Sequence, residues 1–182
     1  RALTIAGISD YEILILTDPG PDGLSDDTAE IAAQIASENS NVRYLPKLFF
    51  VGLGFKYREG IHAATKDYVM TIPAHNLTLE PSLVNLMLHI GQTEAIFTYT
   101  GNPEVRPSEA RFVSKSYVAF CNLLFGLDMR YYNGISIIRR DLLLKVPSLS
   151  NDHVCLAEII IFLVKSGVNY LELPQLLKPS DR

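Results

Sequence analysis

The sequence predicts an α/β protein with a largely parallel sheet. Short segments rich in Val, Ile, Leu and Tyr alternate with helix-like segments along the whole chain. Such alternation is typical of βαβ units, in which a helix connects one parallel strand to the next. The 182 residues contain no linker, repeat or low-complexity tract, and they are enough for one sizeable core. We therefore expect residues 1–182 to form a single domain.

Apolar runs bounded by turn residues predict six strands, and amphipathic or apolar stretches between them predict five helices. Ser25 is expected to cap the first helix, and Asn151 or Asp152 the last. Gly91 and Gly167 are expected to end two of the helices. The strands are expected at residues 11–16, 41–45, 67–72, 94–100, 134–140 and 169–174, and the helices at 25–39, 55–65, 81–91, 111–126 and 150–167.

The composition is that of a globular protein, with 48% hydrophobic and 20% charged residues. A net charge of −4 disfavours a nucleic-acid partner. Cys121 and Cys155 lie far apart in apolar segments without zinc-ligand spacing, so we expect buried, unreactive thiols and a reducing, cytoplasmic location. No apolar run approaches the roughly 20 residues of a membrane-spanning helix, and no signal peptide is recognisable.

Two loops near the start of the chain suit a phosphate-bearing or nucleoside ligand. Asp18 follows the strand at 11–16, where open α/β sheets bind ligands, although its Asp/Pro/Gly-rich loop is also typical of a plain turn. Gly54, Lys56 and Arg58 surround a predicted helix start, where backbone N–H groups and cations attract phosphate. Tyr57 stands at the third glycine of a dinucleotide fingerprint, which disfavours a dinucleotide-dependent enzyme.

His75 and Asn76 follow the strand at 67–72, again where a ligand would bind. A histidine at a strand end is also often a hydrogen-bonded structural residue. Arg106 and Arg111 bracket a helix start, and arginines suit a diphosphate or lipid phosphate as well as a solvated helix entry.

Two further features have both a structural and a functional interpretation. Asn133 and Gly134 precede a strand, where the glycine allows close approach of a ligand or of another backbone segment. Glu158 is the one acid in the apolar run "VCLAEIIIFLV", so it either needs a partner or reaches the surface at a helix edge.

In this order, the motifs resemble family 2 glycosyltransferases of the GT-A fold, and more closely the dolichyl- or polyprenyl-phosphate sugar synthases. "YEILILTD" with its Asp/Gly/Ser-rich loop is similar to the family's nucleotide-binding strand and loop. "GLGFKYREGIHAATKDYVMTIPAHN" is similar to the segment leading to the family's Asp-x-Asp site, and "RPSEARFVSKSYVAFCNLLFGLDMRYYNGISIIRRDLL" to its acceptor-side segment. The resemblance covers nearly the whole chain. It implies a three-layer, GT-A-like sandwich with a mostly parallel sheet.

The resemblance also implies a hexosyltransferase that moves a sugar from a nucleotide-sugar donor to a polyprenyl or dolichyl phosphate at the cytoplasmic membrane face. A divalent metal, Mg²⁺ or Mn²⁺, and a homo-oligomer belong to the same expectation. Catalytic roles would fall to three residues, Arg106, Arg111 and Glu158. Donor binding would involve Asp18, Gly54, Arg58, His75, Asn76, Asn133 and Gly134.

The sequence departs from the family pattern at three points, one of which is the nucleotide loop: it is longer than usual and contains Pro19 and Pro21. The family's first strand is not recognisable before Tyr11. The Asp-x-Asp position reads Pro73-Ala74-His75, and imidazole suits softer metals better than Mg²⁺. His75 could therefore ligate a softer metal, or stand as a cation beside the diphosphate. Alternatively, the site is degenerate and the chain is a binding or partner domain.

Overall fold

The computed structural model of the protein describes residues 1–24, 26–147 and 150–179. Every expected strand and helix is present, with ends that differ from the expected ones by a few residues, and α1, η1 and α6 were not expected. The strands are β1 (Ile13–Thr17), β2 (Val42–Pro46), β3 (Tyr68–Met70), β4 (Ala95–Thr100), β5 (Ser136–Arg139) and β6 (Tyr170–Gln175). The helices are α1 (Ala2–Ile5), α2 (Thr28–Glu38), α3 (Leu53–Ala63), α4 (Glu80–Leu88), η1 (Pro103–Val105), α5 (Ser108–Phe125), α6 (Arg140–Leu143) and α7 (Val154–Lys165).

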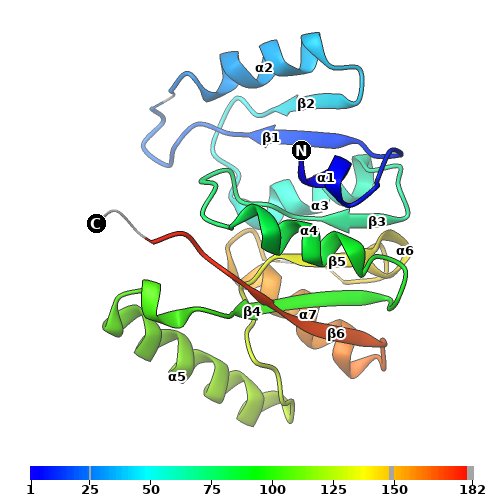
Figure 1. Ribbon diagram of the computed structural model, residues 1–182. Coiled ribbons are helices and arrows are strands. Elements are labelled where there is room, and N and C mark those ends of the chain that lie inside the picture. Colours follow the sequence, from blue (N-terminus) through cyan, green and yellow to red (C-terminus); the bar gives the residue numbers. More distant parts are fainter. Residues whose placement is uncertain (25, 148–149, 180–182) are drawn as a thin grey trace.

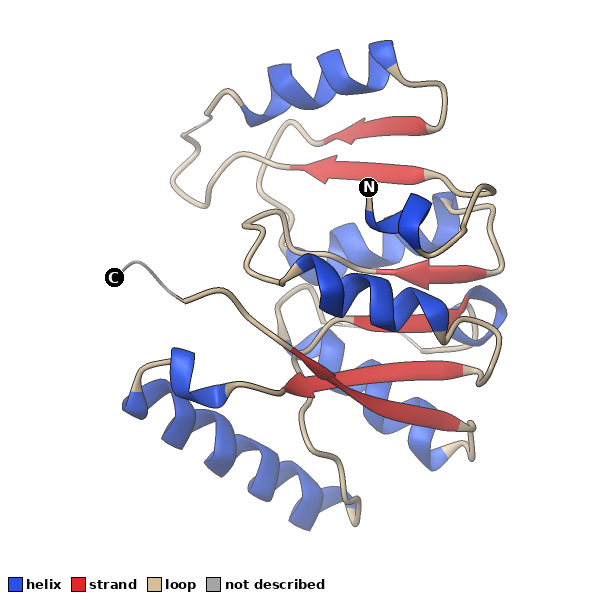
Figure 2. Cartoon of the chain, viewed as in Figure 1, coloured by secondary structure: helices blue, strands red, loops and turns tan. Residues whose placement is uncertain are grey.

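The strands form two sheets rather than one. β1 and β2 make a two-stranded parallel sheet, while a second sheet has the order β3-β5-β4-β6. In the second sheet β5 is antiparallel to both neighbours, and β4 is parallel to β6. Five of the strands therefore point the same way, and β5 points the opposite way (Figure 2). The expected parallel direction is present, but no hydrogen-bonded ladder joins β1 to β3.

Helices cover both faces of the stacked strands, as a three-layer sandwich requires (Figure 1). α1 and α4 contact each other on one face, whereas α3 and α7 contact each other on the opposite face. Alternate residues of β4 face the two layers: Phe97 packs into the larger core with α3 and α7, and Ile96 packs against Leu86 of α4. Cys121 and Cys155 are free and buried, as expected.

The helix starts differ from those expected. Ser25 lies outside the described residues, and the N-cap position of α2 is Asp27, while Asp26 accepts a hydrogen bond from the Thr28 N–H at 3.0 Å. The last long helix has its N-cap at His153 rather than at Asn151 or Asp152, because the preceding segment turns away to contact α3.

Among the helices of residues 1–24, 26–147 and 150–179, none combines the length and hydropathy needed to traverse a bilayer.

Gly134 lies against the backbone of β4. A Cβ atom at this position would be 2.3 Å from Thr98 Oγ1 and 2.4 Å from Thr98 O. The glycine thus allows the approach of another backbone segment, which is one of its two expected roles. It adjoins a buried polar network in which Thr98 Oγ1 donates to Ile135 O and contacts Gln175 Oε1, each at 2.9 Å. Gln175 Nε2 in turn donates to Thr78 Oγ1 at 2.6 Å.

Replacing Gly134 with Ala is expected to lower the free energy of unfolding by roughly 1–3 kcal/mol, because the new methyl group meets backbone that has little room to move. Gly60→Ala is the matched control. Its Cβ would lie 3.6 Å from Leu16 Cδ1, an ordinary contact, and Ala is favoured over Gly inside a helix by about 1 kcal/mol. Urea unfolding of both variants measures the difference. Wild-type stability of Gly134→Ala would contradict the close approach.

Candidate functional site

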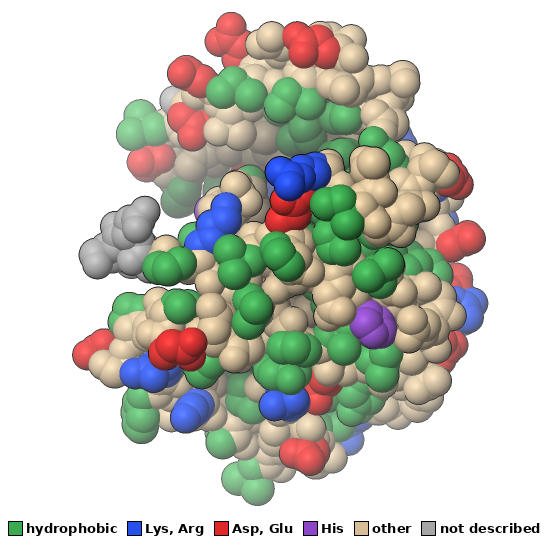
Figure 3. Space-filling view, in the orientation of Figure 1, with side chains coloured by type: hydrophobic (Ala, Val, Ile, Leu, Met, Phe, Trp, Pro, Cys, Tyr) green, Lys and Arg blue, Asp and Glu red, His purple; other side chains and the backbone are tan. Residues whose placement is uncertain are grey.

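The loops that carry most of the predicted site residues lie at one edge of the stacked strands. β1, β2, β3, β4 and β6 all end at this edge, on the left in Figure 2. The molecular surface is hollowed on this side, between the part built by β1, β2 and α2 and the part below it (Figure 3). In open α/β sheets, ligands bind outside the carboxyl ends of the strands, at a break in strand order.

Asp18, directly after β1, is the centre of a tight polar cluster. Its Oδ2 atom accepts hydrogen bonds from the N–H groups of Val51 at 3.0 Å and Gly52 at 3.3 Å. Its Oδ1 atom forms an ion pair with Lys56, and the Asp18 side chain is only 6% exposed. Burial alone would raise the pKa of Asp18, but the Lys56 ammonium and the two N–H groups outweigh burial and lower it. The carboxylate therefore fixes the start of α3 to the end of β1.

Gly54, in the first turn of α3, contacts the segment that precedes α7. Its N–H donates to Asn151 O at 2.7 Å. A Cβ on Gly54 would lie 1.8 Å from Ser150 O, so the space beside this glycine is filled by protein backbone. This packing therefore does not support the prediction that Gly54 helps to bind a phosphate.

Arg58 and Glu158 hold the same segment from two sides. Arg58 Nη2 donates to Asn151 Oδ1 at 2.7 Å, and Glu158 Oε2 accepts the Ser150 N–H at 2.8 Å. The structure thus brings together Gly54, Arg58 and Glu158, from two helices that are far apart in the sequence. Glu158 has the hydrogen-bonding partner that a carboxylate on an apolar helix requires.

His75 and Asn76 lie in an exposed turn after β3. Asn76 has φ = 50°, a left-handed conformation that asparagine tolerates better than most residues. Within the described part of the chain, no cluster of three or more His, Cys, Asp or Glu side chains has a metal-binding arrangement. His75 therefore belongs to no such cluster, whereas Mg²⁺ prefers several oxygen ligands.

Arg106 and Arg111 lie on either side of the start of α5. Arg106 Nη2 donates to Ser114 Oγ at 3.1 Å, whereas the Nε of Arg111 is buried without a hydrogen-bond acceptor among the described residues. Asn133 is exposed beside Gly134, next to the buried network at the end of β4.

Sequence reasoning gave a different role to two polar residues that organise this edge, and it missed a third. Lys56 was expected near phosphate but instead pairs with Asp18. Asn151 was expected to cap α7 but instead binds Gly54 and Arg58. Gln175 links Thr98 and Thr78 across 77 and 97 residues of sequence, and no local pattern signals such long-range pairs.

Asp18→Asn is expected to destabilise the fold by roughly 2–3 kcal/mol at pH 7, since it weakens three charge-assisted contacts. The pKa of Asp18 is lower in the folded state, so its stabilisation is present above the unfolded-state pKa, which is about 3.9. It is lost as the pH falls through the lower, folded-state pKa. The difference between wild type and variant should therefore shrink in acid.

Asp10→Asn is the matched control, because it removes an exposed Asp–Lys pair that should contribute less than about 1 kcal/mol. Denaturant unfolding between pH 3 and 8 tests both variants. A difference between wild type and Asp18→Asn that stayed constant with pH would argue against a charged Asp18.

No described protein family matches the sequence, and no curated protein sequence matches it either. The structure is similar to crystal structures of glucosyl-3-phosphoglycerate synthase from Mycobacterium tuberculosis. The complex with UDP has a TM-score of 0.63 and 17% identity, and the match covers 96% of this chain and 62% of that one. The complex with Mn²⁺, UDP and glucosyl-3-phosphoglycerate has a TM-score of 0.58 and 16% identity. That match also covers 96% of this chain and 62% of the other.

A third complex, with Mn²⁺, UDP-glucose and phosphoglyceric acid, has a TM-score of 0.59 and 12% identity, covering 100% of this chain and 75% of that one. The chain thus spans less than two thirds of the first of these structures. At such identities the likeness concerns the fold alone. The protein has the α/β architecture of the GT-A fold, as the resemblance implied.

Proposed function

We propose that the protein transfers a sugar from a nucleotide-sugar donor to a phosphate-bearing acceptor. The observation that carries the proposal is the likeness, over 96% or more of the chain, to structures solved with UDP, UDP-glucose and Mn²⁺. The strand edge that carries Asp18 and His75 is also where an open α/β sheet binds ligands.

The transfer is a displacement at the anomeric carbon. An acceptor oxygen forms the new bond to that carbon while the bond from the carbon to the diphosphate oxygen breaks, and the departing nucleoside diphosphate keeps the electron pair. Negative charge therefore grows on the leaving group, and fixed cations close to it stabilise the transition state. An acceptor phosphate is already an anion, so the reaction has little need of a strong base.

Arg111 is the best candidate for contact with a phosphate. Its buried Nε lacks an acceptor among the described residues, and guanidinium groups bind phosphate oxygens with well-defined geometry. Arg106 lies on the same helix entry and assists. Asp18 contributes by positioning Lys56 and the Gly52 N–H, and the exposed Asn76 and Asn133 are the candidates for contact with the sugar.

A divalent ion would supply further charge stabilisation at the diphosphate. His75 is the residue of this chain that would hold it, and its imidazole fits Mn²⁺ better than Mg²⁺. The exposed turn at His75 offers no carboxylate cluster within the described residues, so the donor's own phosphate oxygens would complete the ligand set.

A polyprenyl phosphate is the acceptor that the surface of α5 favours. Phe112, Phe120, Leu123 and Leu124 of this helix are all exposed, close in sequence to Arg106 and Arg111. Exposed aromatic and aliphatic side chains beside cations suit the interface of a membrane. A hollow between the end of α5 and α7 could hold part of a lipid chain; its lining is mostly apolar, although Glu158, Lys165 and Ser166 also border it. The same helix face is where a homo-oligomer would form.

A second candidate is a binding or partner domain with the same fold and no catalysis. The observation that favours it is the lack of a carboxylate cluster around His75 in the described residues.

Titration calorimetry with UDP tests donor binding, which the transferase proposal requires. We expect binding that Mn²⁺ strengthens, and a loss of about tenfold or more in affinity for Arg111→Ala. Arg139→Ala is the matched control, with the same charge change at an arginine that pairs with Glu94 and Asp141. His75→Ala should remove the effect of Mn²⁺ and leave metal-free binding unchanged. No UDP binding with Mn²⁺, Mg²⁺ or EDTA would eliminate the enzyme proposal.

Flotation with vesicles containing an anionic lipid tests the acceptor class. We expect the wild type to float with the vesicles and the double variant Phe120→Ser/Leu123→Ser to lose at least half of the bound fraction, since burial of a large apolar side chain contributes about 2 kcal/mol. Leu88→Ser, exposed on α4, is the control and should bind as the wild type does. Equal flotation of all three proteins would point to a water-soluble phosphate acceptor.

A further inference from the structure

A hollow of about 190 Å³ lies between the second half of α3 and the segment that runs from α6 to Pro147. None of the described residues that line it belongs to the loops that follow β1, β2, β3 or β4, where the donor is expected to bind. An apolar cavity of about 150 Å³ holds a benzene ring, so this hollow has room for an apolar group of that size. Its apolar lining consists of Ile61, Leu143, Leu144, Val146 and Pro147.

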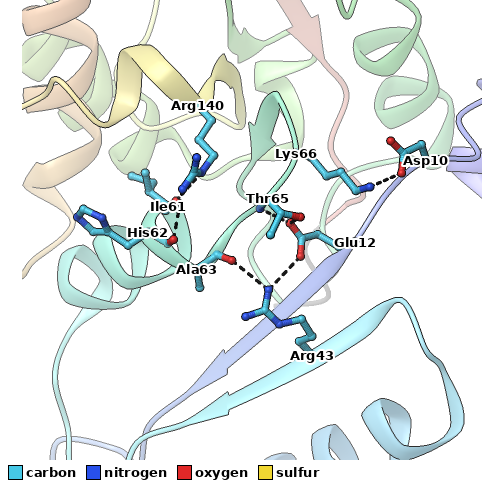
Figure 4. Close-up of polar contacts among 9 residues, drawn as sticks. All are labelled: Asp10, Glu12, Arg43, Ile61, His62, Ala63, Thr65, Lys66 and Arg140. Atoms are coloured by element: carbon cyan, nitrogen blue, oxygen red, sulfur yellow. Dashed lines mark hydrogen bonds and ion pairs between the residues drawn. The ribbon is translucent and has the colours of Figure 1, made fainter.

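The polar lining of the hollow is basic. Of the described residues that line it, Arg58 and His62 are the two with ionisable side chains, and they lie one turn apart on α3. Arg58 Nη2 donates to Asn151 Oδ1 at 2.7 Å, which holds the guanidinium in place. His62 is exposed, and its imidazole extends away from Arg140 in Figure 4. A guanidinium and an imidazole are both hydrogen-bond donors that suit a carboxylate.

The carboxylates of the two helices beside the hollow are already paired with cations. Glu59 is the one acid of α3, and it forms an ion pair with Lys47 at 2.5 Å. Asp141 is the one acid of α6, and it forms an ion pair with Arg139 at 2.8 Å. Because these acids are neutralised by their own partners, the basic side chains of the lining determine the electrostatic potential in the hollow.

The C-terminal end of α3 would ordinarily repel an anion, because the helix dipole is negative there. Two arginines cover the carbonyl groups at this end (Figure 4). Arg140 Nε donates to Ile61 O at 3.0 Å, and Arg140 Nη2 donates to His62 O at 3.3 Å. Arg43 Nη1 donates to Ala63 O at 3.0 Å. The two guanidinium groups thereby offset the negative end of the helix next to the hollow.

The neighbouring hollow between α5 and α7 has a different lining. It shares Val146 and Pro147 with the smaller hollow, but Glu158 borders it as well as Lys165. Charges of both signs give that hollow no preference for an anion. In the part of the chain that the structure describes, the smaller hollow combines an apolar wall with basic side chains alone. This combination suits a ligand with an apolar body and one negative group.

We propose that the hollow between α3 and α6 binds a small organic carboxylate whose apolar body is about the size of a benzene ring. The apolar body packs against Ile61, Leu143 and Val146, and the carboxylate accepts hydrogen bonds from Arg58 and His62. A ligand with so few atoms binds with a dissociation constant of about 1 mM. The proposal does not rest on the proposed function, because donor binding is expected at the carboxyl ends of the strands.

An NMR titration of the 182-residue chain with benzoate tests the proposal. Benzamide is the matched neutral probe, since it has nearly the same shape. We expect benzoate to shift the amide signals of Leu143 and Leu144 and the imidazole signals of His62 until they saturate. Benzamide should bind about tenfold more weakly, because it lacks the charge. The amide signals of Asp18 and Gly52 report on the expected donor site and should not move.

Two variants test the basic lining without changing Arg58, which is also a predicted donor-binding residue. His62→Ala should weaken benzoate binding by about threefold or more, because it removes one hydrogen-bond donor. Leu144→Glu places a negative charge at the exposed rim and should weaken binding by about tenfold or more. His89→Ala is the matched control, because its imidazole bonds to Asn85 O on α4, and it should bind benzoate as the wild type does.

Equal binding of benzamide and benzoate would overturn the proposal, as would shifts that rise linearly and never saturate. Unchanged benzoate affinity in either His62→Ala or Leu144→Glu would also contradict it. Shifts confined to Asp18 and Gly52 would show that benzoate binds at the expected donor site and that the hollow is not a carboxylate site. Failure of UDP binding would leave each of these outcomes as informative as before, so the two proposals are tested separately.

Discussion

The buried carboxylate of Asp18 joins the end of β1 to the start of α3, through the N–H groups of Val51 and Gly52 and the ammonium of Lys56. This position fixes where α3 begins. It thereby determines that Gly54 meets the backbone at Ser150 and Asn151, and the same segment is held by Arg58 and Glu158. Three regions distant in sequence are thus organised around one ionised group. A buried carboxylate is stable in this environment only because all three partners are present.

The local chemistry of the sequence was enough to predict the strands and the main helices, because apolar runs and turn residues act over a few neighbours. It was not enough for the roles of Gly54 and Gly134. Each glycine could make room for a ligand or for another backbone segment, and only tertiary packing shows that Ser150 and Thr98 fill those spaces. The β1 run was correctly predicted as a strand, but its partners could not be predicted, since strand order depends on contacts across the whole chain.

The candidate site differs from a metal-centred one in how its charges are used. At the strand edge, the buried Asp18 carboxylate already binds Lys56 and two backbone N–H groups. The exposed turn after β3 has a histidine where the family has an acid. In the proposed reaction, fixed cations would then be the main source of stabilisation for a departing diphosphate. Arg106 and Arg111 are the candidates for these cations. Both lie near the start of α5, the long helix that follows β4, and the Nε atom of Arg111 is buried.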